Sequence, residues 1–496
     1  MSGRTKDYQN EKLTGNLNLD IAIFKEIFKN ESALRIKYIR SRNKVNYDCA
    51  LIYIDGMING TQINDSIIKP IITVDAMPDS EDLTEYIEKQ VLFARDIKKK
   101  SLVSDILEGV LYGEVLLLIS GSLEALLIDS KGWRTRGISE PKNETVLQGP
   151  REGFDEAALL NVAMIRRKLQ TPDFCTEMLR IGRRSSTIVF ICYLNTLTDK
   201  KILSELKRKL EKIDIDGILD SNYISEQIRA DKFSLFSTIG STERPDIIAS
   251  KLLEGRIAVV VDGTPVVLTL PYLFSENFQS DEDYYLNFLF ASSGRILRYI
   301  SFFLSISIPA IFISLLAFHT SLLPTSLAIA IARLRGGVPF SPSTECIIML
   351  FVFEALREAG LRMSQNLGHT LSVVGGLVVG QAAVEARIIS TPMLIVIALS
   401  GICGLMVPKL RSAVLYLRIA LLIASALFGL YGFFIGISII IMHIISLSSF
   451  GVDYTVSLRK SSFQSLKDTI IRADFKKMLT RPLFNFNLIR QKRYKK

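Results

Sequence analysis

Two patterns of hydrophobic and polar residues divide this chain near residue 285. Before that point, short amphipathic and apolar segments alternate. Apolar residues recur at helical spacing in the first helix expected, at Leu17, Ile21, Phe24 and Phe28. Residues 49–54 then form a short apolar run, which predicts a strand. Alternating helices and strands predict an α/β (or α+β) fold for this half.

The same order of elements recurs further along. Strands are expected at residues 115–119 and 125–128, and again at 187–193, with a charged helix at 200–210. Two more apolar runs, 256–261 and 266–270, flank Asp262-Gly263, and an Asp-Gly step between apolar runs indicates a hairpin. Corresponding elements lie about 140 residues apart, which predicts two related subdomains.

Beyond residue 285 the pattern changes to long uncharged runs. Their lengths are 20, 18, 21 and 34 residues, at 299–318, 367–384, 388–408 and 419–452. A bilayer-spanning helix needs about 20 apolar residues, so this half predicts an all-α polytopic membrane domain. The longest run would have to tilt strongly or extend beyond the bilayer.

Two shorter segments are harder to place in a bilayer. Residues 320–332 are too short to span comfortably, which favours a re-entrant or interfacial segment. Residues 343–360 carry four charged side chains and are expected at an interface or a watery cavity. With both termini on the cytoplasmic side the number of spans is even; four is expected, and six remains open. The expected units are cytoplasmic subdomains 1–145 and 146–285, a transmembrane domain 286–452 and a cytoplasmic tail 453–496.

Composition and charge reduce the number of function classes that fit the sequence. The net charge is +10, but 12 Lys/Arg and three Asp lie after residue 447, so the tail alone carries +9. A basic tail after a membrane segment favours a cytoplasmic anchor on anionic lipid over nucleic-acid binding. Five widely spaced cysteines without a CxxC pair indicate neither a disulfide framework nor a zinc site. The N-terminus lacks the apolar core of a signal peptide.

Catalytic motifs are not found. The three histidines, His319, His369 and His443, fall in or beside apolar runs, and no HExxH, GxSxG or GxxxxGK[ST] pattern occurs. Neither an enzyme class nor a cofactor or metal is therefore expected.

A stripe of small residues marks the segment 368–387. Its members recur every four residues, at Gly368, Ser372, Gly376 and Gly380. On a helix they would form one face that another helix can approach closely, either within one subunit or in an oligomeric ring. Other positions of this segment are pore-lining or gate candidates: Leu371, Val374, Leu377, Val378, Gln381 and Glu385. Apolar residues in a ring can close a pore by dewetting, and a Glu ring favours cations.

A cluster of charges precedes that segment. Glu354, Arg357, Glu358 and Arg362 share one helical face at i, i+3, i+4 and i+8. Pairing among themselves is the simpler interpretation. A proton or substrate relay is the alternative, because ionisable groups at membrane depth are costly and often functional.

Several stretches of the chain resemble the A subunit of GerA-type spore germinant receptors. They are EPKNETVLQGPREGF at 140–154, STERPD at 241–246, LLEGRIAVVVDGTPVVLTLP at 252–271, DEDYY at 281–285, LLPTSLAIAI at 322–331, VPFSPSTE at 338–345, EALREAGLRM at 354–363 and GHTLSVVGGLVVGQAAVEA at 368–386. The first ~50 residues and the tail carry no such signature.

The resemblance implies a membrane protein of the inner spore membrane with a two-subdomain cytoplasmic domain. It further implies a pentameric ring around an ion-conducting pore, working with a transporter-like B subunit that binds the nutrient and a lipoprotein C subunit. Two other hypotheses stay open. A secondary transporter would carry a small metabolite itself, and a scaffold of the germination machinery would conduct nothing.

Overall fold

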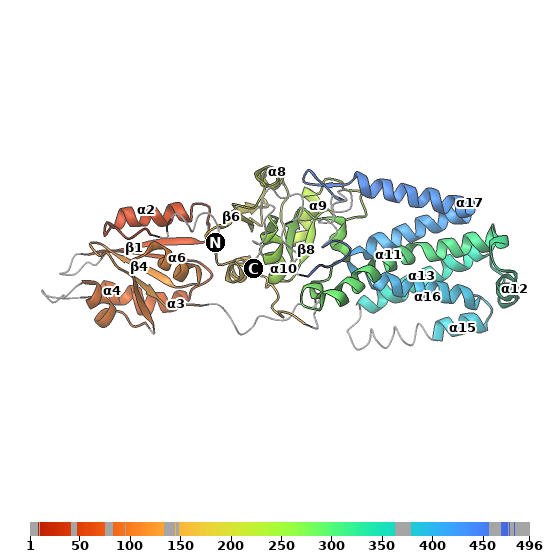
Figure 1. Cartoon of the computed structure of the whole chain (residues 1–496), viewed down its shortest axis with the longest axis horizontal. Helices are drawn as coiled ribbons and strands as arrows, with labels where there is room; N and C mark the ends of the chain where they lie inside the picture. Colours follow the sequence, from red (N-terminus) through yellow and green to blue (C-terminus); the bar gives the residue numbers. More distant parts are fainter. Residues whose placement is uncertain are drawn as a thin grey trace.

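The fold was analysed in a computed structural model of the whole chain. The α/β region lies at one end of the molecule and the long helices at the other (Figure 1). The structure describes residues 8, 10–40, 47–74, 83–94, 96–132, 144, 148–362, 378–455, 468–474, 476 and 481.

The first sheet contains five antiparallel strands in the order β1-β2-β4-β5-β3. The strands are β1 (Leu34–Arg40), β2 (Asp48–Ile54), β3 (Ile97–Lys100), β4 (Val115–Ile119) and β5 (Ala125–Ile128). Helices α2 (Leu17–Ile27) and α6 (Val103–Leu111) pack on one face. Short helices pack on the other: α3 (Gly60–Ile63), η1 (Asn64–Ile68), α4 (Lys69–Thr73), α5 (Leu83–Tyr86) and η2 (Ile87–Val91). Because both faces are covered, β4 and β5 are buried along their whole length.

The second sheet repeats this topology, with the antiparallel order β6-β7-β9-β10-β8. Its strands are β6 (Phe174–Ile181), β7 (Thr187–Leu194), β8 (Gly240–Thr242), β9 (Ile257–Val261) and β10 (Val267–Leu270). Helices α8 (Lys200–Glu211) and α9 (Ser221–Ile228) cover one face, and α7 (Ala158–Lys168) and α10 (Pro245–Leu253) the other. Each strand thus has its counterpart in the first sheet at the same place in the order.

The mixed α/β fold class predicted from the sequence is confirmed, and it is of the α+β kind because the sheet pairs are antiparallel. The local turn signal also predicted the hairpin: Val259 lies opposite Leu268 across Asp262-Gly263. Gly263 has a φ of +90°, a left-handed conformation that glycine adopts without strain.

One buried ion pair joins the two sheets. Glu31, just before β1, contacts the guanidinium of Arg166 on α7, and both side chains are almost fully buried. The hydroxyl of Thr176 on β6 donates to the same carboxylate. Backbone bonds from Ser32 N to Thr176 O (2.9 Å) and from Thr176 N to Asn30 O (3.1 Å) complete the contact.

The helical region begins at α11 (Phe288–Ala317). The following helices are α12 (Thr325–Leu334), α13 (Pro342–Arg362), α15 (Gly380–Glu385), α16 (Thr391–Leu405) and α17 (Arg411–Ser446). Within the described residues, two helices are long and apolar enough to cross a membrane, residues 288–317 and 408–446, with mean hydropathies of 2.3 and 2.2. The expected run 388–408 forms a helix of only 15 residues, bounded by Pro392 and Pro408.

The expectation that the 34-residue run forms one tilted or protruding helix is wrong, because α17 folds back on itself. At Gly429 the backbone has φ 61° and ψ −142°, which is not helical. A Cβ on Gly436 would lie 2.7 Å from Cδ2 of Leu421, whereas in a straight helix these residues would be about 22 Å apart. The run therefore consists of two helices that pack side by side.

Because α17 reverses, both of its termini lie beside the second sheet, and its turn at Gly429 lies far from the sheets. At the near end, Lys409 Nζ donates to Gln279 O (3.3 Å) and Ser449 Oγ donates to Thr238 O (2.6 Å). At the far end, a Cβ on Gly429 would lie 3.0 Å from the side chain of Phe318, where α11 ends. A two-stranded sheet of β11 (Ser448–Ser449) and β12 (Val452–Asp453) follows α17.

Candidate functional site at the junction of sheets and helices

Most of the predicted small stripe and pore face lies outside the described residues. This holds for Gly368, Leu371, Ser372, Val374, Gly376 and Leu377. The end of the segment is described, and there Val378 is exposed and Gln381 Nε2 donates to Glu385 Oε1 (2.9 Å). Gly380 is buried against Leu394 of α16 in the same chain. This one position therefore packs within the subunit.

The predicted charge cluster is paired on α13. Arg357 contacts Glu354, and Arg362 Nη2 lies 2.7 Å from Glu358 Oε1. The two pairs differ in surroundings: side chains are 79% and 57% exposed in the Arg362 pair, but 24% and 18% in the Arg357 pair. Only the Arg357–Glu354 pair, called the inner pair below, therefore faces the other helices.

A residue missed in the sequence analysis, Arg418, completes the inner group. It is 2% exposed, and its Nη1 lies 3.8 Å from Glu354 Oε1. Its guanidinium donates to Ser305 O (3.0 Å), Ser305 Oγ (2.9 Å) and Ser400 O (3.3 Å). Arg418 thus joins α11, α13, α16 and α17. The available signal was a single cation inside an otherwise apolar helix.

The link from sheet to helices is a second group of buried charges. Between β10 and α11 lie two short helical segments, η3 (Phe274–Phe278) and η4 (Asp281–Tyr284). Asp283 accepts from Arg295 Nε (2.7 Å) and Arg298 Nη2 (2.7 Å) on the first turns of α11. Burial opposes ionisation of Asp283, but Arg298 and Arg295 outweigh it and hold the pKa of this carboxyl below its usual value. The carboxylate therefore stays charged and fixes the start of α11.

The tail returns to the same place. Asp468 Oδ1 lies 2.9 Å from Arg295 Nη1, and Arg472 Nη1 donates to Leu286 O (3.3 Å). Arg481 Nε donates to Leu253 O (2.8 Å). These tail residues thus lie on the protein itself.

A third group of buried charges connects Arg256, at the start of β9, to Glu276 of η3. Glu276, 3% exposed, contacts Arg256, and its Oε2 lies 2.8 Å from Lys251 Nζ. Burial alone would raise the pKa of Glu276, but Arg256 and Lys251 lower it to about 2. The backbone N of Leu273 also donates to Glu276 Oε1 (2.7 Å), so the acid fixes the start of η3 as well.

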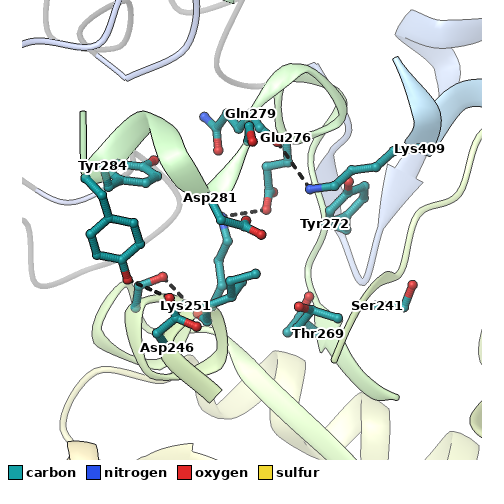
Figure 2. Close-up of a pocket in the computed structure, with 15 residues that line it drawn as sticks. Ser241, Asp246, Lys251, Thr269, Tyr272, Glu276, Gln279, Asp281, Tyr284 and Lys409 are labelled. Carbon is teal, nitrogen blue, oxygen red and sulfur yellow. Dashed lines mark hydrogen bonds and ion pairs between the residues drawn. The ribbon is translucent and has the colours of Figure 1, made fainter. Parts of the chain in front are cut away.

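A cavity of about 90 Å³ lies between these groups (Figure 2). Its lining comes from α10, from β8 and β10, from η3 and η4, and from Lys409 at the entry to α17. Asp246 on its wall accepts from Tyr285 Oη (2.5 Å), and burial raises the pKa of Asp281. Because the lining residues belong to both regions, a movement of the second sheet would reach both α11 and α17.

The junction could pass a movement from the second sheet to the helices, or bind a polar molecule in its cavity. Within the described part of the chain, no group of three or more His, Cys, Asp and Glu side chains could hold a metal ion. The buried cations and carboxylates neutralise one another, and they connect segments far apart in the sequence. Such networks fix one arrangement of the elements they join.

Sheets linked through buried ion pairs to long apolar helices define a membrane-associated protein with a large polar domain. The GerA profile, described as Bacillus/Clostridium GerA spore germination protein, matches residues 22–484. The chain therefore belongs to the GerA family of spore germination proteins, which contains germinant-receptor A subunits.

Individual relatives cover nearly the whole chain. Spore germination protein KA of Bacillus subtilis (strain 168) is 38% identical over 93% of this chain and 85% of its own length. Spore germination protein A1 of the same organism is 33% identical over 94% of this chain and 95% of its own. A crystal structure of the N-terminal domain of the A subunit of the Bacillus megaterium spore germinant receptor GerK3 is 30% identical, with a TM-score of 0.42, and matches 53% of this chain and 98% of that chain.

Proposed function

We propose that the chain is the A subunit of a spore nutrient-germinant receptor and forms an oligomeric, pentameric ion channel in the inner spore membrane. Nutrient binding to a transporter-like B subunit opens it, and a lipoprotein C subunit completes the receptor. Membership of the GerA family supports the receptor role. The observation that supports conduction is Arg418, a cation buried among apolar helices with Glu354 and Arg357 beside it.

Such a group is expensive in a membrane. A charge at bilayer depth costs several kcal/mol, so ionisable residues there commonly mark ion or proton pathways. The three side chains carry two positive charges and one negative, so the group keeps a net positive charge. Small shifts of α13 against α17 would break the 3.8 Å contact between Arg418 and Glu354, which makes the group a candidate for gating.

The helix directions support six crossings. α11 runs from the junction to the far end, and the halves of α17 run out and back. α13 and α16 both run toward the junction, because Glu345 meets Ser390 near their starts and Phe353 lies by Gly401 further along. If these five helical segments cross, an even count requires a sixth crossing, which we assign to the segment between α13 and α16 that contains residues 368–387. This is the segment proposed to line the pore.

The proposal also places both termini. The α/β region and the basic tail are cytoplasmic, and the tail residues beyond Arg481 contact anionic lipid. No nucleic-acid partner is proposed, since +9 of the +10 net charge belongs to a tail beside a membrane.

Ion flux from the reconstituted A, B and C subunits separates this function from the alternatives. A channel gives nutrient-dependent current steps. A secondary transporter takes up its substrate without steps, and a scaffold gives neither. Absence of any nutrient-dependent current from an assembled, nutrient-binding complex would overturn the channel.

The pore segment has its own test. Gly376→Leu should dissociate or inactivate the oligomer, because a large side chain forces apart helices that only small residues allow to touch. Ile440→Leu on α17 is the control and should do little. Leu377→Ala or Val378→Ala should leak without nutrient, and Glu385→Gln should change cation preference. Normal assembly, normal nutrient response and no leak across these variants would exclude this segment from the pore.

A further inference from the structure

We infer that the loop of residues 229–237 inserts Phe233 into the surface of the bilayer beside the last turns of α17. The inference rests on the proposed crossing of the membrane by α17. The loop connects α9 to β8, so it belongs to the second sheet.

The loop holds Phe233 outward from a rigid base. Phe233 is 96% exposed, whereas Ser234 and Phe236 on either side of Leu235 are buried. Asp231 Oδ1 accepts from the backbone N of Phe233 (3.0 Å), which fixes a turn at this point. An apolar ring held in water on a fixed loop is unfavourable unless something covers it.

The base of the loop is attached to a proposed spanning helix. Ser234 Oγ lies 3.1 Å from Nε2 of His443 on α17, and the Phe236 ring lies 6.2 Å from the imidazole. His443 precedes the end of α17, Ser446, by three residues, or about 4.5 Å along the axis. Interfacial apolar segments sink about 5–10 Å into the headgroup region, so the loop lies at the appropriate depth.

Two further features select lipid as the occupant. Large apolar side chains of α17 around His443 are exposed as Phe233 is: Ile439, Ile441, Met442 and Ile445. Lys232, the residue before Phe233, is exposed as well. An exposed aromatic residue next to a lysine, beside the end of a proposed spanning helix, matches the headgroup layer of a bilayer.

Tryptophan fluorescence in the full-length chain tests the insertion. The chain has a single tryptophan, Trp133, so Trp133→Phe gives a background without this fluorophore. Three variants in this background then each carry one probe: Phe233→Trp, Leu123→Trp between β4 and β5, and Phe434→Trp on the second half of α17. Each is placed in nanodiscs of phosphatidylcholine and phosphatidylglycerol, with acyl chains brominated either near the glycerol or near the chain end.

The expected result is a depth order. Trp at 233 should be quenched mainly by bromine near the glycerol, at least about twofold more than Trp at 123, because it lies in the interface. Trp at 434 should be quenched mainly by deep bromine. Should the Phe233→Trp chain fail to fold, Leu235→Trp, 38% exposed on the same loop, takes its place.

Three results would overturn the inference. Equal quenching at 233 and 123, with 434 quenched, means that the loop does not touch lipid. A blue-shifted but unquenched Trp at 233 means that a neighbouring protein covers it. An unquenched Trp at 434 means that α17 does not cross the bilayer, which removes the proposed topology together with the loop insertion.

Discussion

At the scale of single residues, two arginines that each pair with a glutamate of α13 should contribute very differently to stability, because one is buried and the other is exposed. Arg418→Met removes a guanidinium that is 2% exposed, and with it the hydrogen bonds from Arg418 to Ser305 O, Ser305 Oγ and Ser400 O. The expected loss of unfolding free energy is about 3–5 kcal/mol, the usual result of breaking a buried charge group. Thermal unfolding of the detergent-solubilised chain measures it.

Arg362→Met is the matched control. This arginine is also paired with a glutamate, but its side chain is 79% exposed, so the change should stay within about 0.5 kcal/mol. Equal melting temperatures for the two variants would contradict the role given to Arg418.

Glu276 should make the stability of the folded chain depend on pH in the acidic range. Its pKa is lowered to about 2 in the folded chain, against about 4.3 when unfolded. Its contribution is therefore complete above the unfolded value and is lost as pH falls from there toward 2. Glu276→Gln should melt lower than the unaltered chain at neutral pH, with a difference that shrinks below about pH 4.

Melting curves between neutral and acid pH compare the two chains. A difference that stays constant across that range would show that the carboxylate does not remain ionised in the fold. Glu282→Gln in the neighbouring segment η4 is the control for the loss of one carboxylate.

At the scale of elements, the break in α17 rests on one glycine. Gly429 has φ 61° and ψ −142°, and a Cβ there would lie 3.0 Å from the Phe318 side chain. Gly429→Ala should lower stability by about 1–3 kcal/mol through backbone strain, with a further contribution from this contact. Gly294→Ala, in the regular helix α11 with only Arg298 Nη2 at 3.5 Å, should be neutral or slightly stabilising. Indistinguishable melting temperatures would mean that the turn can form elsewhere.

The turn at Gly429 is a feature of the fold that could not be predicted from the sequence. Strand positions and the hairpin at Asp262-Gly263 were predictable because their signals are local. Gly429, in contrast, stands in an apolar run together with Gly432 and Gly436, and it is its non-helical backbone in the folded chain that distinguishes it from the other two. Hydropathy therefore predicted the apolar run but not its reversal.

The candidate site was less predictable for a related reason. The pairs on α13 follow from helical spacing, whereas Arg418 meets Glu354 from 64 positions away, and Arg295 meets Asp468 from 173. Such contacts exist only after the helices have packed. The sequence marked the cation and the acids but carried no signal that joins them.

At the scale of the whole molecule, the segment between β10 and α11 packs against the long helices as well as against the second sheet. Phe274 and Phe278 precede residue 285: Phe274 meets Phe302 of α11 edge to face, and Phe278 stacks on Tyr299 of the same helix. A fragment ending at residue 285 should therefore expose these rings and associate with detergent more strongly than one ending at Pro271, which lacks them. Size-exclusion chromatography and circular dichroism compare the two. Aggregation of the shorter fragment alone would contradict this expectation.

The matching strand orders of the two sheets have an evolutionary consequence. β2 begins at residue 48 and β7 at 187, while β5 begins at 125 and β10 at 267, so the separations are 139 and 142 residues. So constant an offset is what duplication of one ancestral unit would leave behind. On that account the second copy is the one that attaches α11 and α17, so its surface is constrained by those helices. The first copy contacts it through Glu31 and Arg166, and we expect family members to differ more on the outer face of this first copy.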